Sequence, residues 1–104
     1  MLFEFITAYL AGKYLFSGCN NDPAIWQNVL LIKERVNDTT IAKLENTYRS
    51  MSRNERNDLS KNIKTFRESL KSVRKSASDK KLRKEIDELI KNCERIESIC
   101  NRWF

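Results

Sequence analysis

The stretches LSKNIKTFRESLKSVRKSA (residues 59–77) and LRKEIDELIKNCERIESICNRW (residues 82–103) decide the fold of this chain. In each stretch an apolar residue recurs at alternating steps of four and three, which keeps one apolar seam on one side of an α-helix, as in coiled coils. The first seam consists of Leu59, Ile63, Phe66, Leu70, Val73 and Ala77, and the second of Leu82, Ile86, Leu89, Cys93, Ile96, Cys100 and Trp103.

The two seams are out of phase with each other. If the first seam continued, it would bury Lys80, Lys84, Asp87 and Lys91. The helix must therefore break between Ser76 and Lys81, and the simplest result is an antiparallel, coiled-coil-like helical hairpin over residues 52–104. Because Ile90 and Ile99 widen the second seam toward the C-terminus, we expect that end of the hairpin to pack on the preceding helices and its tip to project or to bind elsewhere.

The first part of the chain carries helix signals of its own. Residues 2–16 are apolar nearly all round, which is typical of a central helix. Asp22 followed by Pro23 is the pattern of an N-cap and a first helical residue, so a second helix is expected over residues 23–36. Its expected apolar face consists of Ile25, Trp26, Val29, Leu30, Ile32 and Val36.

Capping residues delimit the remaining helices. Thr39 or Thr40 is expected to cap a third helix, and Ser76 or Ser78 the last one. Ser52-Arg-Asn-Glu55 matches a capping box, so the fourth helix should begin at Arg53. The apolar stripe of the third helix is Ile41, Leu44, Tyr48 and Met51. The sequence thus predicts one all-α domain over residues 1–104, with about five helices: a helical base (1–51) and the hairpin (52–104).

The composition restricts the classes of function that this chain can have. The chain has 104 residues with two glycines and one proline, few turn residues for a strand-rich fold. It contains no histidine, which excludes a Cys–His or Ser–His–Asp site within the chain and removes the commonest metal ligand. We therefore expect no enzymatic activity, no cofactor and no metal site.

The cysteines indicate a reducing compartment. Cys93 and Cys100 are seven residues apart on one expected helix, about 10 Å of rise at ~1.5 Å per residue, which is too far for a disulfide. Both lie on the apolar seam, where a thiol behaves as a small hydrophobe. Together with Cys19 they make an odd number without a bridging pattern, so we expect a cytoplasmic protein.

The net charge of +6 is concentrated in one segment. Residues 1–51 are electrically balanced, whereas residues 61–84 contain ten basic residues against Glu68 and Asp79, a net charge of +8. Such clustering around an exposed turn favours an electrostatic contact with an acidic protein, phosphates or anionic lipid, although a solvated helix surface is the alternative. The candidate partner-binding residues of this basic tip are Lys71, Arg74, Lys75, Lys80, Lys81, Arg83 and Lys84, and Phe104 is a weaker candidate.

These features favour a non-enzymatic binding protein. We expect a small inhibitor or accessory subunit, of the kind that phages encode, that engages a larger protein or nucleoprotein assembly. One alternative is a nucleic-acid-binding protein whose tip contacts backbone phosphates. Another is a membrane-associated protein anchored by residues 2–16, where Gly18-Cys19 resembles the end of a bacterial lipoprotein signal peptide. The helical seams would also allow a homodimer.

Overall fold

The computed structural model describes residues 21–102, and no strand occurs among them. Their elements are α2 (Asp22–Lys33), α3 (Asp38–Thr47), the short 3₁₀-helix η1 (Tyr48–Ser50), α4 (Arg53–Ser76) and α5 (Lys80–Arg102). The all-helical prediction is confirmed for this part of the chain. Outside the described residues lie the expected first helix (2–16), Cys19, Trp103 and Phe104.

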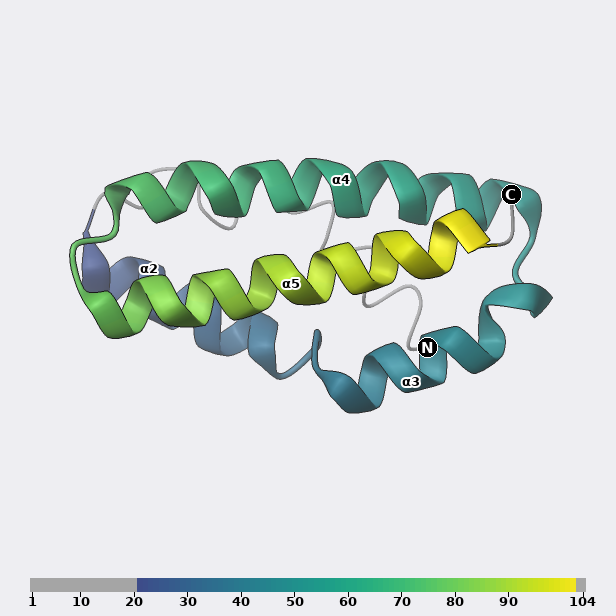
Figure 1. Cartoon of the computed structure of the whole chain (residues 1–104), viewed down its shortest axis with the longest axis horizontal. Helices are drawn as coiled ribbons and strands as arrows, with labels where there is room; N and C mark the ends of the chain where they lie inside the picture. Colours follow the sequence, from purple (N-terminus) through teal and green to yellow (C-terminus); the bar gives the residue numbers. More distant parts are fainter. Residues whose placement is uncertain (1–20, 103–104) are drawn as a thin grey trace.

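The two long helices, α4 and α5, lie side by side along most of their length (Figure 1). The predicted capping box starts α4: the Ser52 hydroxyl accepts from the Glu55 N–H at 3.2 Å, and the Glu55 carboxylate accepts from the Ser52 N–H at 3.2 Å. The helical path stops at Ser76 and resumes at Lys80, inside the predicted break. We call the connection of residues 77–79 the α4–α5 turn.

Burial follows the sequence pattern of the two long helices. Every described residue of both predicted seams is buried, and Ile90 and Ile99 are buried beside the second seam. The stripe of α3 and η1 that ends at Met51 is buried as well, so all these side chains belong to one apolar core. A single core of this kind explains why the apolar periodicity of each segment is so regular.

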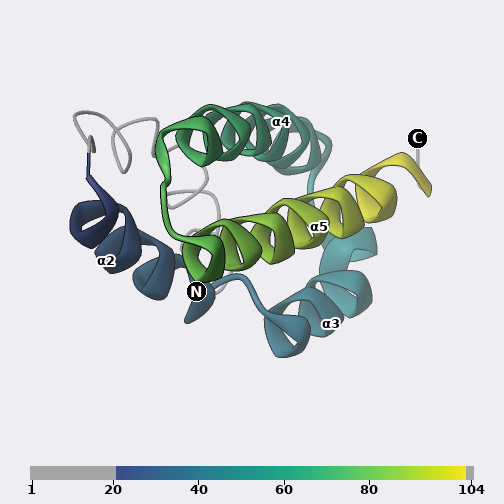
Figure 2. The ribbon, with the colours of Figure 1, turned by 60° about the vertical axis from the view of Figure 1, so that its left-hand side comes forward.

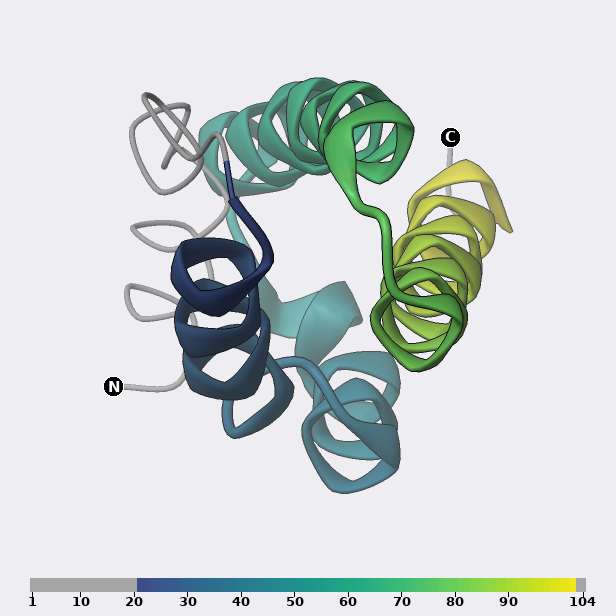
Figure 3. The same cartoon turned by 90° about the vertical axis from the view of Figure 1, so that its left-hand side faces the viewer.

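Helix α5 is covered on a second side by α2 and α3 (Figures 2 and 3). Polar contacts mark the alignment: Asp22 with Ser78 and Asp79, Lys33 with Glu85, Asn92 with the Val36 carbonyl, Arg95 with Asp38, and Arg102 with Glu45. Residue numbers rise together in both partners, so the segment from α2 to α3 runs parallel to α5. Seen end-on, α2, α3, α5 and α4 are arranged around the shared apolar core (Figure 3).

The caps of the shorter helices differ from the prediction. Asn21, not Asp22, caps α2, because its side chain accepts from the Ala24 N–H at 3.0 Å. Asn37 caps α3, where Thr40 is the second half of a capping box rather than the cap. In both places an asparagine one to three residues upstream of the expected cap accepts the free N–H groups.

Two other expectations about α2 and α5 are wrong. The side chain that accepts from the first turn of α5 is Asp79, whose carboxylate bonds the Lys81 N–H at 3.0 Å, and neither Ser76 nor Ser78 does so. On α2 the buried strip is Ile25, Val29 and Ile32, and Val36 continues it after the helix ends at Lys33. Leu30 lies off this strip and is 55% exposed, so the apolar face is narrower than expected.

Candidate functional site: the lysine-rich turn between α4 and α5

The structure gathers the seven basic candidates around one turn. Lys71, Arg74 and Lys75 lie in the last turns of α4, and Lys80, Lys81, Arg83 and Lys84 lie in the first turns of α5. All seven are exposed. The candidate Phe104 lies outside the described residues.

The two arginines of this group have local structural partners. Arg74 donates from Nε to Asp87 Oδ1 at 2.6 Å and from Nη2 to Oδ2 at 3.3 Å, a bidentate pair between α4 and α5. This hydrogen bond, with the attraction of the same carboxylate, raises the pKa of Arg74. Arg83 donates from Nε to the Ala77 carbonyl at 2.7 Å and so closes the turn from α5. Arg74 and Arg83 therefore fix the shape of the turn.

The side-chain ammonium groups of the five lysines make no hydrogen bond or ion pair with any described residue. We call Lys71, Lys75, Lys80, Lys81 and Lys84 the lysine cluster. Their ammonium groups are exposed on a turn that other side chains hold in place. Their positive charge is therefore available to an external anion.

Asp22, at the start of α2, also holds the α4–α5 turn in place. Its Oδ1 accepts from the Ser78 N–H at 3.0 Å, and its Oδ2 accepts from the Asp79 N–H at 3.0 Å. Of the two expectations for the tip, projection is not observed, because the Asp22 carboxylate attaches the tip to the start of α2. The sequence suggested only a local role for Asp22, as the cap beside Pro23, and its actual partners are 56 and 57 residues away.

Replacement of Asp22 tests this attachment. Asp22→Ala should lower the free energy of unfolding by about 0.5–2 kcal/mol, since two backbone N–H groups lose a carboxylate acceptor, as when a helix cap is removed. Asp22→Asn keeps one oxygen acceptor and should cost less. Urea denaturation followed by circular dichroism measures both values. Equal stability of Asp22→Ala and the wild type would show that water replaces the carboxylate without loss.

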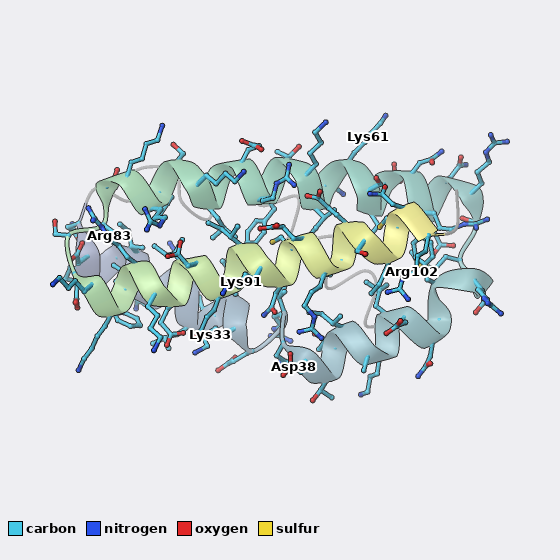
Figure 4. The ribbon with its side chains drawn as sticks, viewed as in Figure 1. Lys33, Asp38, Lys61, Arg83, Lys91 and Arg102 are labelled. Carbon is cyan, nitrogen blue, oxygen red and sulfur yellow. The ribbon has the colours of Figure 1, made fainter. Side chains whose placement is uncertain are left out.

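A groove of about 400 Å³ lies between the α2–α3 junction and α5. Ion pairs of Lys33 with Glu85 and of Arg95 with Asp38 link its two walls, which come from α2, α3 and α5 (Figure 4). Its charges are thus largely neutralised by one another. Within residues 21–102 no cluster of His, Cys, Asp and Glu could hold a metal ion.

The buried thiols have no features of a reactive site. Cys93 and Cys100 are free and buried, and burial, followed by the nearby Glu97 charge, raises the pKa of Cys93 from 9.0 to about 12. Burial also raises the pKa of Cys100. A thiol is nucleophilic only when deprotonated, so both remain inert core groups at neutral pH. The predicted burial of these two cysteines is confirmed.

These thiols and Tyr48 predict a loss of stability at alkaline pH. Burial raises the pKa of Tyr48 from 10.0 to about 12, so in the folded state all three groups hold their protons longer than in the unfolded chain. Their contribution is complete below about pH 9 and is lost as the pH rises toward about 12. Urea midpoints across this range should fall with pH. The urea midpoint should fall less steeply with pH in the double variant Cys93→Ala, Cys100→Ala. An equal slope in the wild type and the variant would show that the two thiols do not contribute to the alkaline loss of stability.

No protein-family model, curated protein or solved structure matches this chain. None of the helices in the described part is long and apolar enough to cross a membrane.

Proposed function

We propose that this chain is a non-enzymatic binding protein that engages a larger protein or nucleoprotein assembly in the cytoplasm. In this proposal residues 52–104 act as a rigid antiparallel helical hairpin, and the lysine cluster at its turn makes the contact. A small inhibitor or accessory subunit would work in this way, by occupying a surface of its target. Support comes from the exposure of the five lysines and from the bonds of Asp22 and Arg83 that hold the turn.

The observation that carries the proposal is the position of lysines at the start of α5. The N-terminus of a helix has a partial positive charge and favours acidic side chains. The capping carboxylate of Asp79 is followed in the first turn of α5 by Lys80 and Lys81 and by no further acidic residue. The two lysines add positive charge to the positive end of the helix, opposite in sign to the Asp79 carboxylate that caps it. A contact with an external anion accounts for it.

Charge reversal at these two positions should therefore stabilise the domain. Lys80→Glu and Lys81→Glu are each expected to raise the free energy of unfolding by about 0.3–1 kcal/mol, because an acidic side chain at this helix end is favourable. Lys43→Glu, in the middle of α3, should change it by less than about 0.5 kcal/mol. Urea midpoints at low salt measure all three. If both glutamates destabilise the domain, lysines at these two positions are not unfavourable for the start of α5.

Capture from a lysate of the native host tests the binding role. The tagged full chain is compared with a cluster variant (Lys75→Glu, Lys80→Glu, Lys84→Glu) and a control variant (Lys43→Glu, Arg53→Glu, Lys91→Glu). Both variants change the net charge equally, and all six positions are exposed. We expect the wild type and the control to retain the same partner and the cluster variant to lose it. Equal retention by all three would show that the cluster is only a solvated surface.

A further inference from the structure

The positive charge that remains available on α4 and α5 is mostly that of lysines. Most arginines of these helices are occupied: Arg67 by Glu97 at 2.7 Å, Arg74 by Asp87, Arg83 by the Ala77 carbonyl, Arg95 by Asp38, Arg102 by Glu45, and Arg56 over the Tyr48 ring at 5.9 Å. Lysine is a flexible point charge, whereas arginine is suited to bidentate recognition of one defined group. The external anion is therefore contacted through charge rather than through a fixed geometry.

The lysine cluster continues into a strip along α4. Lys61, Lys64, Lys71 and Lys75 follow one another at steps of three, seven and four, on the side of α4 opposite its buried seam. Lys61 points away from α5 (Figure 4). The acidic residue within the strip, Glu68, lies 3.3 Å from Arg67 and is partly neutralised by it. At ~1.5 Å per residue the strip extends about 21 Å, far more than a single anionic group needs.

The side chains around these lysines fit phosphates better than a protein surface. Ser72, Ser76 and Ser78 are exposed near the turn and add hydroxyl donors. Protein interfaces are depleted in lysine and serine and depend on aromatic and arginine anchors. Among residues 21–102 the exposed large apolar side chains are Leu30 and Leu31, both on α2. By contrast, lysine and serine are common donors to phosphate oxygens of nucleic acids.

We infer that the lysine cluster and the α4 strip bind the phosphate backbone of a duplex nucleic acid without reading its bases. The inference rests on the proposed function and names the chemistry of its partner. A duplex is favoured over a single strand because no exposed aromatic side chain of the described residues offers a stacking platform. With roughly four to six phosphate contacts, log K should fall with log salt at a slope between about −3.6 and −5.4.

Fluorescence anisotropy with labelled duplex DNA tests the inference. The full chain is titrated with two unrelated duplexes of about 20 base pairs and one single strand of equal length, at about 50 to about 200 mM salt. A strip variant (Lys64→Gln, Lys71→Gln) is compared with a control of equal net charge (Lys43→Gln, Lys91→Gln). Circular dichroism confirms that both remain folded, as expected for exposed positions.

The expected result is equal affinity for the two duplexes, weaker binding of the single strand and a steep salt dependence. The strip variant should lose about tenfold or more in affinity, and its salt slope should become shallower by about 2, whereas the control should lose less than about threefold. No duplex binding at the lowest salt, or equal losses in both variants, would overturn the inference.

Nuclease treatment of the host lysate separates this inference from the proposed function. If nuclease abolishes capture that depends on the lysine cluster, both are supported. If the captured protein survives nuclease and still depends on the cluster, the proposed function holds, but the partner is an acidic protein and this inference fails. If duplex DNA binds through the strip but the cluster variant captures the same partner from the lysate as the wild type, the inference stands and the proposed function fails.

Discussion

Leu70→Ala and Leu89→Ala are each expected to lower the free energy of unfolding by about 2–5 kcal/mol. Both leucines lie in the seams between α4 and α5 and are at most 1% exposed. Truncation to alanine removes their transfer free energy and leaves a cavity that the neighbouring side chains fill only in part. Urea denaturation followed by circular dichroism measures the change.

Lys71→Ala is the matched control for Leu70→Ala, because it lies next to it on α4 but is exposed. Its effect should stay within about 0.5 kcal/mol. An effect of Leu89→Ala no larger than this control would mean that the second seam is not packed in the free protein. The size of the two leucine effects therefore reports directly on the core that α4 and α5 share.

Tyr48→Ala should cost about 3–5 kcal/mol, as the truncation of a buried aromatic residue usually does. Tyr48 is 1% exposed in η1, and its hydroxyl donates to the Cys100 carbonyl at 3.3 Å. It thereby fixes the segment after α3 against the last turns of α5. A loss of this size would show that α3 and η1 are part of the cooperative core.

Tyr48→Phe separates packing from the hydrogen bond in this contact. It retains the ring and removes the hydroxyl, so it should cost no more than about 1 kcal/mol. Chemical denaturation of both variants, monitored at two wavelengths, compares the two effects. If Tyr48→Phe proves as harmful as Tyr48→Ala, the hydrogen bond rather than the ring holds η1 in place.

Local pattern was enough to predict the long helices. The seam positions, the start of α4 at Arg53 and the break before Lys80 all follow from spacing and capping within one segment. Such features depend on neighbours three or four residues away, which the sequence displays directly. The gathering of the basic candidates around one turn follows from that break.

The rest of the site depended on contacts between distant residues. The sequence marks Asp22 as acidic but not as the acceptor of the Ser78 and Asp79 N–H groups. It marks Arg74 and Arg83 as basic but not as partners of Asp87 and of a backbone carbonyl. No local rule distinguishes these arginines from the available lysines, because the difference arises only when α4, α5 and α2 come together.

The parallel alignment of α2 and α3 with α5 also determines where the chain can change its length. Asp22, Val36, Asp38 and Glu45 bond to residues 56 or 57 positions further on, and Lys33 and Tyr48 bond to residues 52 positions further on. All these pairs depend on the register between the two segments. An extra residue inside α5 would rotate every later side chain by about 100° and misalign all subsequent pairs. An extra residue between η1 and α4 would lengthen only a connection, at a cost that grows slowly with loop length. Insertions and deletions among variants of this chain should therefore collect at residues 51–52 rather than within its helices.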